Sequence, residues 1–200
     1  MNIGIDIDNT IGDTFRGIIE YYVRNGHDVN KEDLILEEGW VKELKGIATE
    51  KDINILFQTS KDFLDNIAPY PATRAILSLS RHHHLHLITA RPKSADISRR
   101  ETYNWLKKHN IIVDSVTHTD NKPDIIKKLE IDVMIEDSPY EVPRIVSLGI
   151  PILLLDQPYN QELNHESITR FTHWLEIPTL IKRLTTKQSQ EALLVQEVAK

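Results

Sequence analysis

Cysteine is absent from the 200-residue sequence. Disulfide bonds and thiolate metal sites are therefore excluded, which agrees with an intracellular protein. The sequence also has no apolar run that approaches the roughly 20 residues of a membrane-spanning helix. Met1 is not followed by the basic segment, apolar segment and cleavage site of an export signal. We therefore expect a cytoplasmic protein without a membrane partner.

A basic stripe is missing as well. The chain has 24 Lys and Arg residues against 30 Asp and Glu residues, for a formal net charge of -6. Proteins that bind nucleic-acid polymers carry clustered basic residues, so we expect no nucleic-acid polymer as a partner. A small anion at a local cationic site stays open. A hydrophobic share of 40% and a charged share of 27% are typical of one globular domain, or of a core with a modest insertion. The oligomeric state stays open, and a homo-oligomer is one alternative.

Short apolar runs alternate with helical patterns along most of the chain. We expect strands over residues 3–7, 85–90, 114–118, 132–136 and 151–156. Helices are expected over residues 71–81, 94–109, 123–130 and 140–148. Strands that alternate with helices in this way predict an α/β fold with helices flanking a parallel sheet.

The first connection is longer than the others and has a different pattern. We find no convincing strand between Asp13 and Tyr70. A helix that ends at Gly26 is indicated by apolar residues at helical spacing, namely Phe15, Ile18, Ile19 and Tyr22. A second helical pattern covers residues 50–66. We therefore predict that helices are inserted after the first strand.

These patterns divide the chain into three parts. The predicted core comprises residues 1–13 and 69–184, and the predicted helical insertion comprises residues 14–68. Residues 185–200 form either a terminal helix or a segment that docks on a partner.

The stretch IDIDNTIGD, residues 5–13, places Asp6 and Asp8 at the end of the first expected strand. An unpaired buried carboxylate is costly there, so the two acids need a reason. In open parallel sheets, ligands bind at the carboxyl ends of the strands, and residues i and i+2 point the same way. We therefore expect both side chains to face one small volume. Asp13 is better explained as the N-cap of a helix that begins near Thr14.

Glu136 and Asp137 stand at the end of another expected strand. Two strand ends thus bring four acids together, and four carboxylates cannot stay ionised side by side without a cation. Hard oxygen ligands in a chain without cysteine favour Mg²⁺. Acidic residues in exposed loop ends are the alternative, but two pairs at equivalent strand ends favour a metal site.

Two further positions carry complementary chemistry. Thr89 ends a strand just before a helix, where its hydroxyl and the following backbone N–H groups can hold phosphate oxygens. Lys122 precedes Pro123 at a helix N-terminus, where the helix dipole disfavours a cation. A residue that breaks a local rule is a candidate for function. Arg91 lies close enough to Thr89 to reach a phosphate, although a surface ion pair explains it equally well.

The histidines and the aromatics have two explanations each. Four histidines fall where a helix passes into a strand, so a metal site is the less favoured explanation for His82, His83, His84 and His86. Trp40, Phe57 and Phe63 either line a ligand pocket or form the core of the insertion, since aromatics dominate packing in small helical units.

The segments DIDNT, LITAR, NKP and IEDSP, in this order, resemble the four motifs of the haloacid dehalogenase superfamily. Most members of that superfamily are Mg²⁺-dependent phosphatases with a Rossmann-like core, and the insertion corresponds to their cap. The segments APYPATRAIL and LLLDQPYN and the spacing of Asp6, Asp8 and Asp13 resemble the 5'(3')-deoxyribonucleotidases and their bacterial nucleotidase relatives. Those enzymes often have an aromatic directly after the third aspartate, whereas here Thr14 precedes Phe15.

The resemblance implies a role for each acid. Asp6 would attack phosphorus and form an aspartyl phosphate, while Asp8 would protonate the leaving oxygen and then deprotonate water. The negative charge of its neighbours would favour the protonated form of Asp8. The Asp6 carboxylate, the Asp8 backbone carbonyl and Asp137 would bind Mg²⁺, with Glu136 and Asp13 in support.

The resemblance also implies how the substrate is held. Thr89, Lys122 and Arg91 would bind the phosphate, because a dianion needs positive charge to approach four acids. Phe15 and Trp40 would line the substrate pocket. The implied substrate is a small phosphate monoester, and we expect a 5'-nucleotidase for (deoxy)ribonucleoside monophosphates.

Asp8 separates several alternatives. True dehalogenases release halide, which needs no proton, so this acid indicates phosphoryl transfer. A phosphomutase stays open, as does a phosphatase for another small metabolite such as a sugar phosphate. A non-catalytic binding protein with this fold is disfavoured, because binding has no need of the acid.

Overall fold

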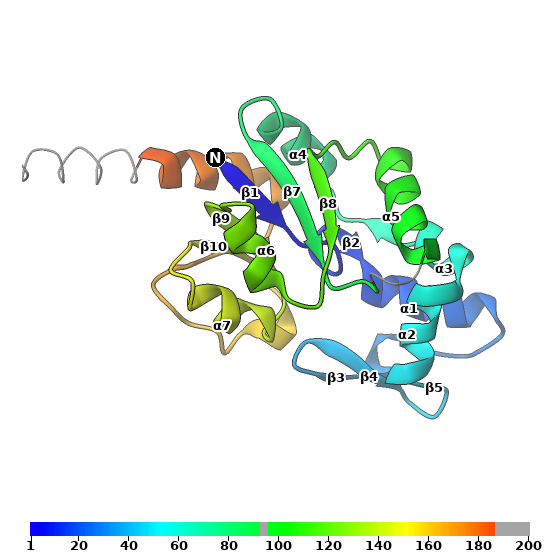
Figure 1. Cartoon of the computed structure of the whole chain (residues 1–200). Coiled ribbons are helices and arrows are strands. Elements are labelled where there is room, and N and C mark those ends of the chain that lie inside the picture. The colour runs from blue at the N-terminus through cyan, green and yellow to red at the C-terminus, as the bar shows by residue number, and fades with distance from the viewer. Residues whose placement is uncertain (93–95, 187–200) are drawn as a thin grey trace, which may run out of the picture.

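The computed structural model describes residues 1–92 and 96–186. Its centre is a six-stranded parallel sheet with the strand order β11-β10-β9-β1-β7-β8 (Figure 1). The predicted α/β fold with a parallel sheet is therefore confirmed. Its strands are β1 (Asn2–Ile5), β7 (His84–Thr89), β8 (Ser115–His118), β9 (Val133–Glu136), β10 (Ile152–Leu155) and β11 (Ile168–Phe171). Only β11 had no counterpart among the predicted strands.

Helices cover both faces of the sheet, because side chains of a strand alternate between its faces. On one face, Ile3 and Ile5 pack with α4 (Thr73–Leu79), α5 (Asp96–Lys108) and the helical residues 177–186. The other face packs against α6 (Lys122–Lys128) and α7 (Glu141–Val146). Helices α4 to α7 confirm the four helices predicted in the core, apart from residues 94 and 95, which lie outside the described residues.

The strand order explains where a site can form. Strand β1 lies between β9 and β7, and Ile5 is opposite Ile135 and Leu87. The chain runs from β1 toward β7 and β8, and later returns to the other side of β1. Ligands of such sheets bind at this switch point, outside the carboxyl ends of the strands. Residues that follow β1 and β9 therefore face one crevice.

The insertion between β1 and β7 contains the predicted helices and also an unpredicted sheet. Its helices are α1 (Thr14–Arg24), α2 (Glu50–Thr59) and α3 (Lys61–Asp65). The expectation of no strand between Asp13 and Tyr70 is wrong. Strands β3 (Leu34–Glu37), β4 (Trp40–Leu44) and β5 (Ala48–Thr49) form an antiparallel sheet, and β2 (Gly12–Asp13) pairs with β6 (Ala68–Pro69). The short 3-10 helix η1 covers Lys31–Asp33.

The unpredicted strands are short, and their stability comes from pairing. Strand β3 alternates half-buried and exposed residues over only four positions, which is too short for a clear period-two pattern. Glu38 and Gly39 have φ angles of 50° and 77° and turn the chain back into β4. A two-residue turn of this kind matches the twist of a hairpin.

The insertion, called the cap below, has its own hydrophobic core. Helices α1 to α3 and strand β4 contribute side chains to it, among them Ile18, Val41, Phe57 and Phe63. Helix α5 of the core packs against α2 and α3. Trp105 of α5 is fully buried, and its Nε1 donates a hydrogen bond to the carbonyl oxygen of Ile67 at 2.7 Å. Helix α5 of the core thus supports the cap.

The histidines of β7 contact residues 114 and 115. His86 at the start of β7 contacts the hydroxyl of Ser115 at 2.8 Å, and His84 lies 3.6 Å from Asp114, so these histidines join neighbouring strands. The turns η2 (Pro158–Asn160) and η3 (Trp174–Glu176) follow β10 and β11. Most of the predicted tail, residues 187–200, lies outside the described residues. Within the described part of the chain, no helix is long and apolar enough to cross a membrane.

Candidate active site

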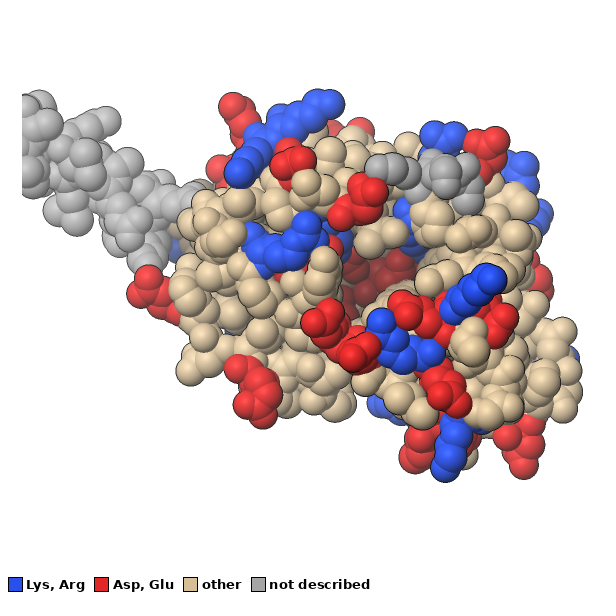
Figure 2. Space-filling view, turned by 60° about the horizontal axis from the view of Figure 1, so that its bottom comes forward, with Lys and Arg blue, Asp and Glu red and all other residues tan. Residues whose placement is uncertain are grey.

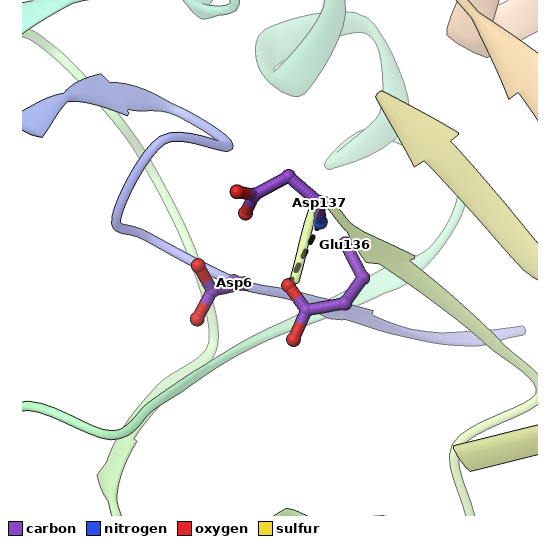
Figure 3. A group of neighbouring side chains, drawn as sticks. All are labelled: Asp6, Glu136 and Asp137. Carbon is purple, nitrogen blue, oxygen red and sulfur yellow. Dashed lines mark hydrogen bonds between the residues drawn. The ribbon is translucent and has the colours of Figure 1, made fainter. Parts of the chain in front are cut away.

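Three buried acids meet at the carboxyl ends of β1 and β9. Asp6 follows β1, Glu136 ends β9, and Asp137 comes next. Their carboxylate oxygens lie within 4.8 Å of one another, and Figure 3 shows the three carboxyl groups around one small space. Within residues 1–92 and 96–186, no other group of three or more acids and histidines is close enough to share a metal ion.

Burial raises the pKa of all three acids. The pKa of Asp6 rises to about 8, and those of Glu136 and Asp137 each rise to about 7. The negative charge of Asp6 adds to the effect of burial on the pKa of Asp137. A carboxyl group that loses its hydration favours the neutral form unless a positive charge replaces the water. Three ionised carboxylates at this place therefore require nearby cations.

Lys122 supplies one positive charge to these acids. It is the first residue of α6 and is 2% exposed. Its Nζ donates to Asp6 Oδ1 at 2.6 Å and to Glu136 Oε1 at 2.5 Å. Burial acts to lower the pKa of Lys122, but the charges of Asp6 and Glu136 outweigh burial, so the pKa is raised. The two acids thus explain a lysine at a helix N-terminus.

The charge that remains on the acids suits a divalent cation. One ammonium group balances only one of the three carboxylates. Every candidate ligand atom is a hard carboxylate oxygen, which is the donor type that Mg²⁺ prefers. Asp6, Glu136 and Asp137 therefore have the charge and the donor atoms that a Mg²⁺ site requires.

Asp8 lies beside these acids, but its carboxylate is bound elsewhere. Arg91 Nε donates to Asp8 Oδ2 at 2.9 Å, and a second guanidinium nitrogen donates to Oδ1 at 2.8 Å. The hydroxyl of Thr14 also donates to Oδ1, at 2.6 Å. Asp8 therefore has a guanidinium group and a hydroxyl as direct partners, in addition to the negative charge of the neighbouring Asp6. The predicted effect of its neighbours' negative charge on Asp8 stays a prediction. The strand ends at Ile5 and the chain turns at Asn9, whose φ is 59°, so strand alternation no longer sets the direction of Asp8.

Arg91 is buried and directs its donors into the protein. Its side chain is 1% exposed, and a third nitrogen donates to the hydroxyl of Thr102 in α5 at 3.2 Å. The guanidinium carbon lies 5.7 Å from the centre of the Phe57 ring in the cap. The predicted alternative was an ion pair at the protein surface. Arg91 does form an ion pair, with Asp8, but its side chain is buried. Binding of a phosphate by Arg91 stays a prediction.

Thr89 and Asp13 have different surroundings. Thr89 is fully buried at the end of β7, and its hydroxyl oxygen accepts a hydrogen bond from the backbone N–H of Arg91 at 3.2 Å. Asp13 caps α1, as predicted, because its carboxylate accepts from the backbone N–H of Arg16 at 3.3 Å. Asp13 lines a separate hollow next to Phe15, apart from the three acids.

A cavity of about 410 Å³ lies between the core and the cap. The core side of its lining includes Asp6, Lys122 and Asp137, and the cap side includes Trp40 and Phe57. Figure 2 shows this hollow with acidic side chains on its floor. Its volume is in the range of small-molecule sites. Both explanations of the cap aromatics therefore hold, because Phe57 also belongs to the cap core.

Phe15 lies behind the cavity wall. Its ring centre is 6.4 Å from that of Trp40 and 5.5 Å from that of Tyr159. The lining of the 410 Å³ cavity contains Trp40 but not Phe15. Of the two predicted pocket residues, the structure thus brings Trp40 to the cavity and places Phe15 as its support.

Sequence reasoning missed three residues that hold Asp137. The hydroxyl of Thr10 donates to Asp137 Oδ1 at 2.5 Å, and the hydroxyl of Tyr159 donates to Oδ2. The Asn160 side-chain amide donates to the backbone carbonyl of Asp137 at 2.8 Å. Thr10 lies in the DIDNT motif, while Tyr159 and Asn160 lie in LLLDQPYN. Both segments stood out in the sequence, but no local pattern shows that they reach Asp137.

The acids, the lysine and the threonine lie at the strand ends of a parallel sheet, as the resemblance to the haloacid dehalogenase superfamily led us to expect. Solved structures of that superfamily share the fold. A superfamily hydrolase from Ehrlichia chaffeensis aligns with a TM-score of 0.51 and 12% identity, over 92% of this chain and 97% of that one. CbbY from Rhodobacter sphaeroides, solved in complex with phosphate, aligns with a TM-score of 0.54 and 14% identity, over 88% and 95%.

Within that class, the chain belongs to the family described as "5' nucleotidase, deoxy (Pyrimidine), cytosolic type C protein", whose sequence model matches residues 1–189. Nucleotidase CA_C3379 of Clostridium acetobutylicum is 26% identical over 94% of this chain and 96% of its own length. YqfW of Bacillus subtilis is 30% identical over 88% of this chain and 91% of its own length. The chain is therefore a phosphoric monoester hydrolase, as predicted.

The raised pKa of Asp137 predicts how stability depends on pH without divalent cations. A carboxyl group with a higher pKa in the folded state binds more protons when folded, so the free energy of unfolding falls as pH rises between the two values. For Asp137 this window runs from 3.8 to about 7. In EDTA, we expect wild-type stability to fall relative to Asp137→Asn across this window, measured by urea unfolding. A pH-independent offset between Asp137→Asn and the wild type would contradict the prediction.

Proposed function

We propose that the protein is a Mg²⁺-dependent 5'-nucleotidase that hydrolyses (deoxy)ribonucleoside monophosphates through an aspartyl phosphate on Asp6. The observation that carries the proposal is the group of Asp6, Glu136 and Asp137 around the buried Lys122, on the floor of a cavity with aromatic cap residues. Membership of the nucleotidase family supports the same reaction. The family description also supports a cytoplasmic location, which is part of the proposal.

The chemistry divides between the two aspartates. An oxygen of Asp6 attacks phosphorus, and the bond from phosphorus to the ester oxygen breaks as Asp8 gives that oxygen a proton. Water then attacks the phosphorus of the aspartyl phosphate while Asp8 takes a proton from it, which releases inorganic phosphate and restores Asp6. Arg91 and Thr14 hold the Asp8 carboxylate at the side of the cavity.

Positive charge is needed because the substrate is a dianion that enters an acidic site. Lys122 contacts two acids directly and offsets part of their charge. Mg²⁺, when bound by Asp6, Asp137 and the Asp8 carbonyl, would neutralise the phosphate further and stabilise its transition state. The hydroxyl of Thr89 and the N–H groups that follow it complete the proposed phosphate site.

The cap supplies the features for a nucleobase. Trp40 and Phe57 present aromatic surface to the cavity, and the amide of Asn54 lies in the same lining. Phe15 and Phe57 pack around Trp40, with ring centres 6.4 Å and 5.6 Å from it. A supported indole ring is suited to stack on a base. The proposal therefore assigns base stacking to Trp40 and places Phe15 behind it.

Metal removal tests the reaction class. Activity on a generic aryl phosphate should disappear in EDTA and return with Mg²⁺, because the acids otherwise repel the phosphate. Asp137→Asn should weaken Mg²⁺ binding sharply in calorimetry, while the exposed control Asp28→Asn should bind Mg²⁺ like the wild type. Full activity in the chelator would contradict the proposed metal dependence.

Substitution of the two aspartates tests their separate roles. Asp6→Asn should abolish turnover because it removes the nucleophile, whereas Asp8→Asn should lower kcat by about 10² to 10⁴ because it removes proton transfer. Rapid-quench labelling with a phosphate-labelled substrate should place the phosphate on Asp6. Label on a serine or histidine would contradict the mechanism.

The substrate class is tested with Trp40→Ala. Base stacking contributes about 1 to 3 kcal/mol in single-strand binding proteins, so its loss should raise KM for dUMP or dTMP roughly ten- to a hundredfold. KM for a small aryl phosphate should change much less, and Phe15→Ala should show the same selectivity more weakly. If the wild type prefers sugar phosphates to every nucleotide in a panel, the nucleotide assignment is wrong and a sugar-phosphate phosphatase replaces it.

A further inference from the structure

Asp137 is held from three sides by residues of other segments. Thr10 Oγ1 and the hydroxyl of Tyr159 donate to its two carboxylate oxygens, one each. Asn160 Nδ2 donates to the Asp137 carbonyl at 2.8 Å and to the Leu155 carbonyl at 2.9 Å. These contacts fix both the backbone and the side-chain direction of Asp137. A metal ligand oriented in this way loses less freedom when the metal binds.

Tyr159 is suited to this task because its hydroxyl donates to Asp137 Oδ2, while Thr10 donates to Oδ1. A hydrogen bond to one oxygen of a metal-binding carboxylate fixes the direction of that carboxylate. Phenylalanine at this position would keep the ring but leave one Asp137 oxygen without this partner.

The ring of Tyr159 also contacts the cap. It packs edge-on against Phe15 of α1, with ring centres 5.5 Å apart. The tip of the β3–β4 hairpin, at Gly39, lies against Pro139 and Tyr159. A Cβ atom on Gly39 would lie 2.8 Å from Pro139 Cγ and 3.3 Å from Tyr159 Cδ2. The hairpin tip therefore fits against the core only without a side chain.

Pro139 and Tyr159 place this cap contact next to the metal ligand. Pro139 is two residues after Asp137 in the chain, and Tyr159 donates to the Asp137 carboxylate. The hairpin whose tip is Gly39 also carries Trp40 into the cavity. One small contact area thus joins the substrate wall of the cap to the loop that holds Asp137.

We propose that Tyr159 is a positioning residue that orients Asp137 for Mg²⁺ and, through its ring, joins that carboxylate to the tip of the cap hairpin at Gly39. The inference rests on the metal site of the proposed function. The inference predicts that two substitutions outside the four sequence motifs weaken Mg²⁺ binding. One is at Tyr159 in the turn after β10, and the other is at Gly39 in the cap.

Tyr159→Phe tests the hydroxyl. Calorimetry should show a Kd for Mg²⁺ about ten- to a hundredfold higher than that of the wild type, as expected for a residue that orients a metal ligand. At saturating Mg²⁺, kcat should return to the wild-type value, which a general structural defect would not allow. Thr10→Val removes the donor on the other oxygen and should change the Kd in the same direction.

Gly39→Ala tests the link to the cap, with Gly46→Ala as its matched control. Both glycines have positive φ angles, 77° and 69°, but a Cβ on Gly46 would meet no atom within 4 Å. Gly39→Ala should raise the Kd for Mg²⁺ and the KM for the substrate, whereas Gly46→Ala should change neither. Equal effects of the two variants would overturn the link to the cap, because backbone strain alone would then explain both.

The outcomes separate this inference from the proposed function. If the wild type binds no Mg²⁺ in calorimetry, both the metal site and the role of Tyr159 are overturned. If the wild type binds Mg²⁺ and Tyr159→Phe binds it equally tightly, only the role of Tyr159 is overturned. Weaker binding by Tyr159→Phe with kcat restored at saturating Mg²⁺ supports the inference.

Discussion

The buried contact of Lys122 with Asp6 and Glu136 is the interaction on which the rest of the site depends. Lys122 lies 116 positions from Asp6 and 14 positions from Glu136 in the chain, and its ammonium group contacts both. Removing one partner of a buried ion pair typically costs about 3–5 kcal/mol, because the other charge is left uncompensated. The charge of Lys122 acts to lower the pKa of Asp6 and of Glu136 against the effect of burial, and so favours the ionised form that the proposed nucleophile Asp6 requires. One ammonium group leaves a net negative charge on three ionised carboxylates, which supports the proposed Mg²⁺ site.

The order of the strands turns this local contact into a site. Because β1 lies between β7 and β9, the residues that follow these strands share one edge of the sheet. Thr89, Asp6 and Asp137 come from three neighbouring strand ends, and α6 adds Lys122 from the side. Rigid strands and a buried lysine hold these groups at fixed separations. Reacting groups that are held in the right geometry react faster, because less freedom is lost in the transition state.

Two of the contacts between the cap and the core involve the proposed acid and the proposed metal ligand. Arg91 holds Asp8 and lies over the Phe57 ring, so the proposed acid is joined to the cap wall. Tyr159 holds Asp137 and packs against Phe15, so the proposed metal ligand is joined to the cap as well. Each aspartate thus has a partner that also contacts the cap. The cap therefore contributes to the geometry of the acids in addition to lining the cavity.

The sequence by itself determined five of the six strands of the main sheet, helices α4 to α7, and the acids and lysine at the strand ends, because these features follow from periodicity, helix caps and charge. It did not reveal β3 to β5, whose strands are short and are stabilised by pairing with one another. Only the tertiary structure decided that Asp8 meets Arg91, 83 residues away, and that Tyr159 meets Asp137, 22 residues away. Such contacts depend on strand order and on the direction of the chain beyond a strand end, and no local pattern of residues encodes either.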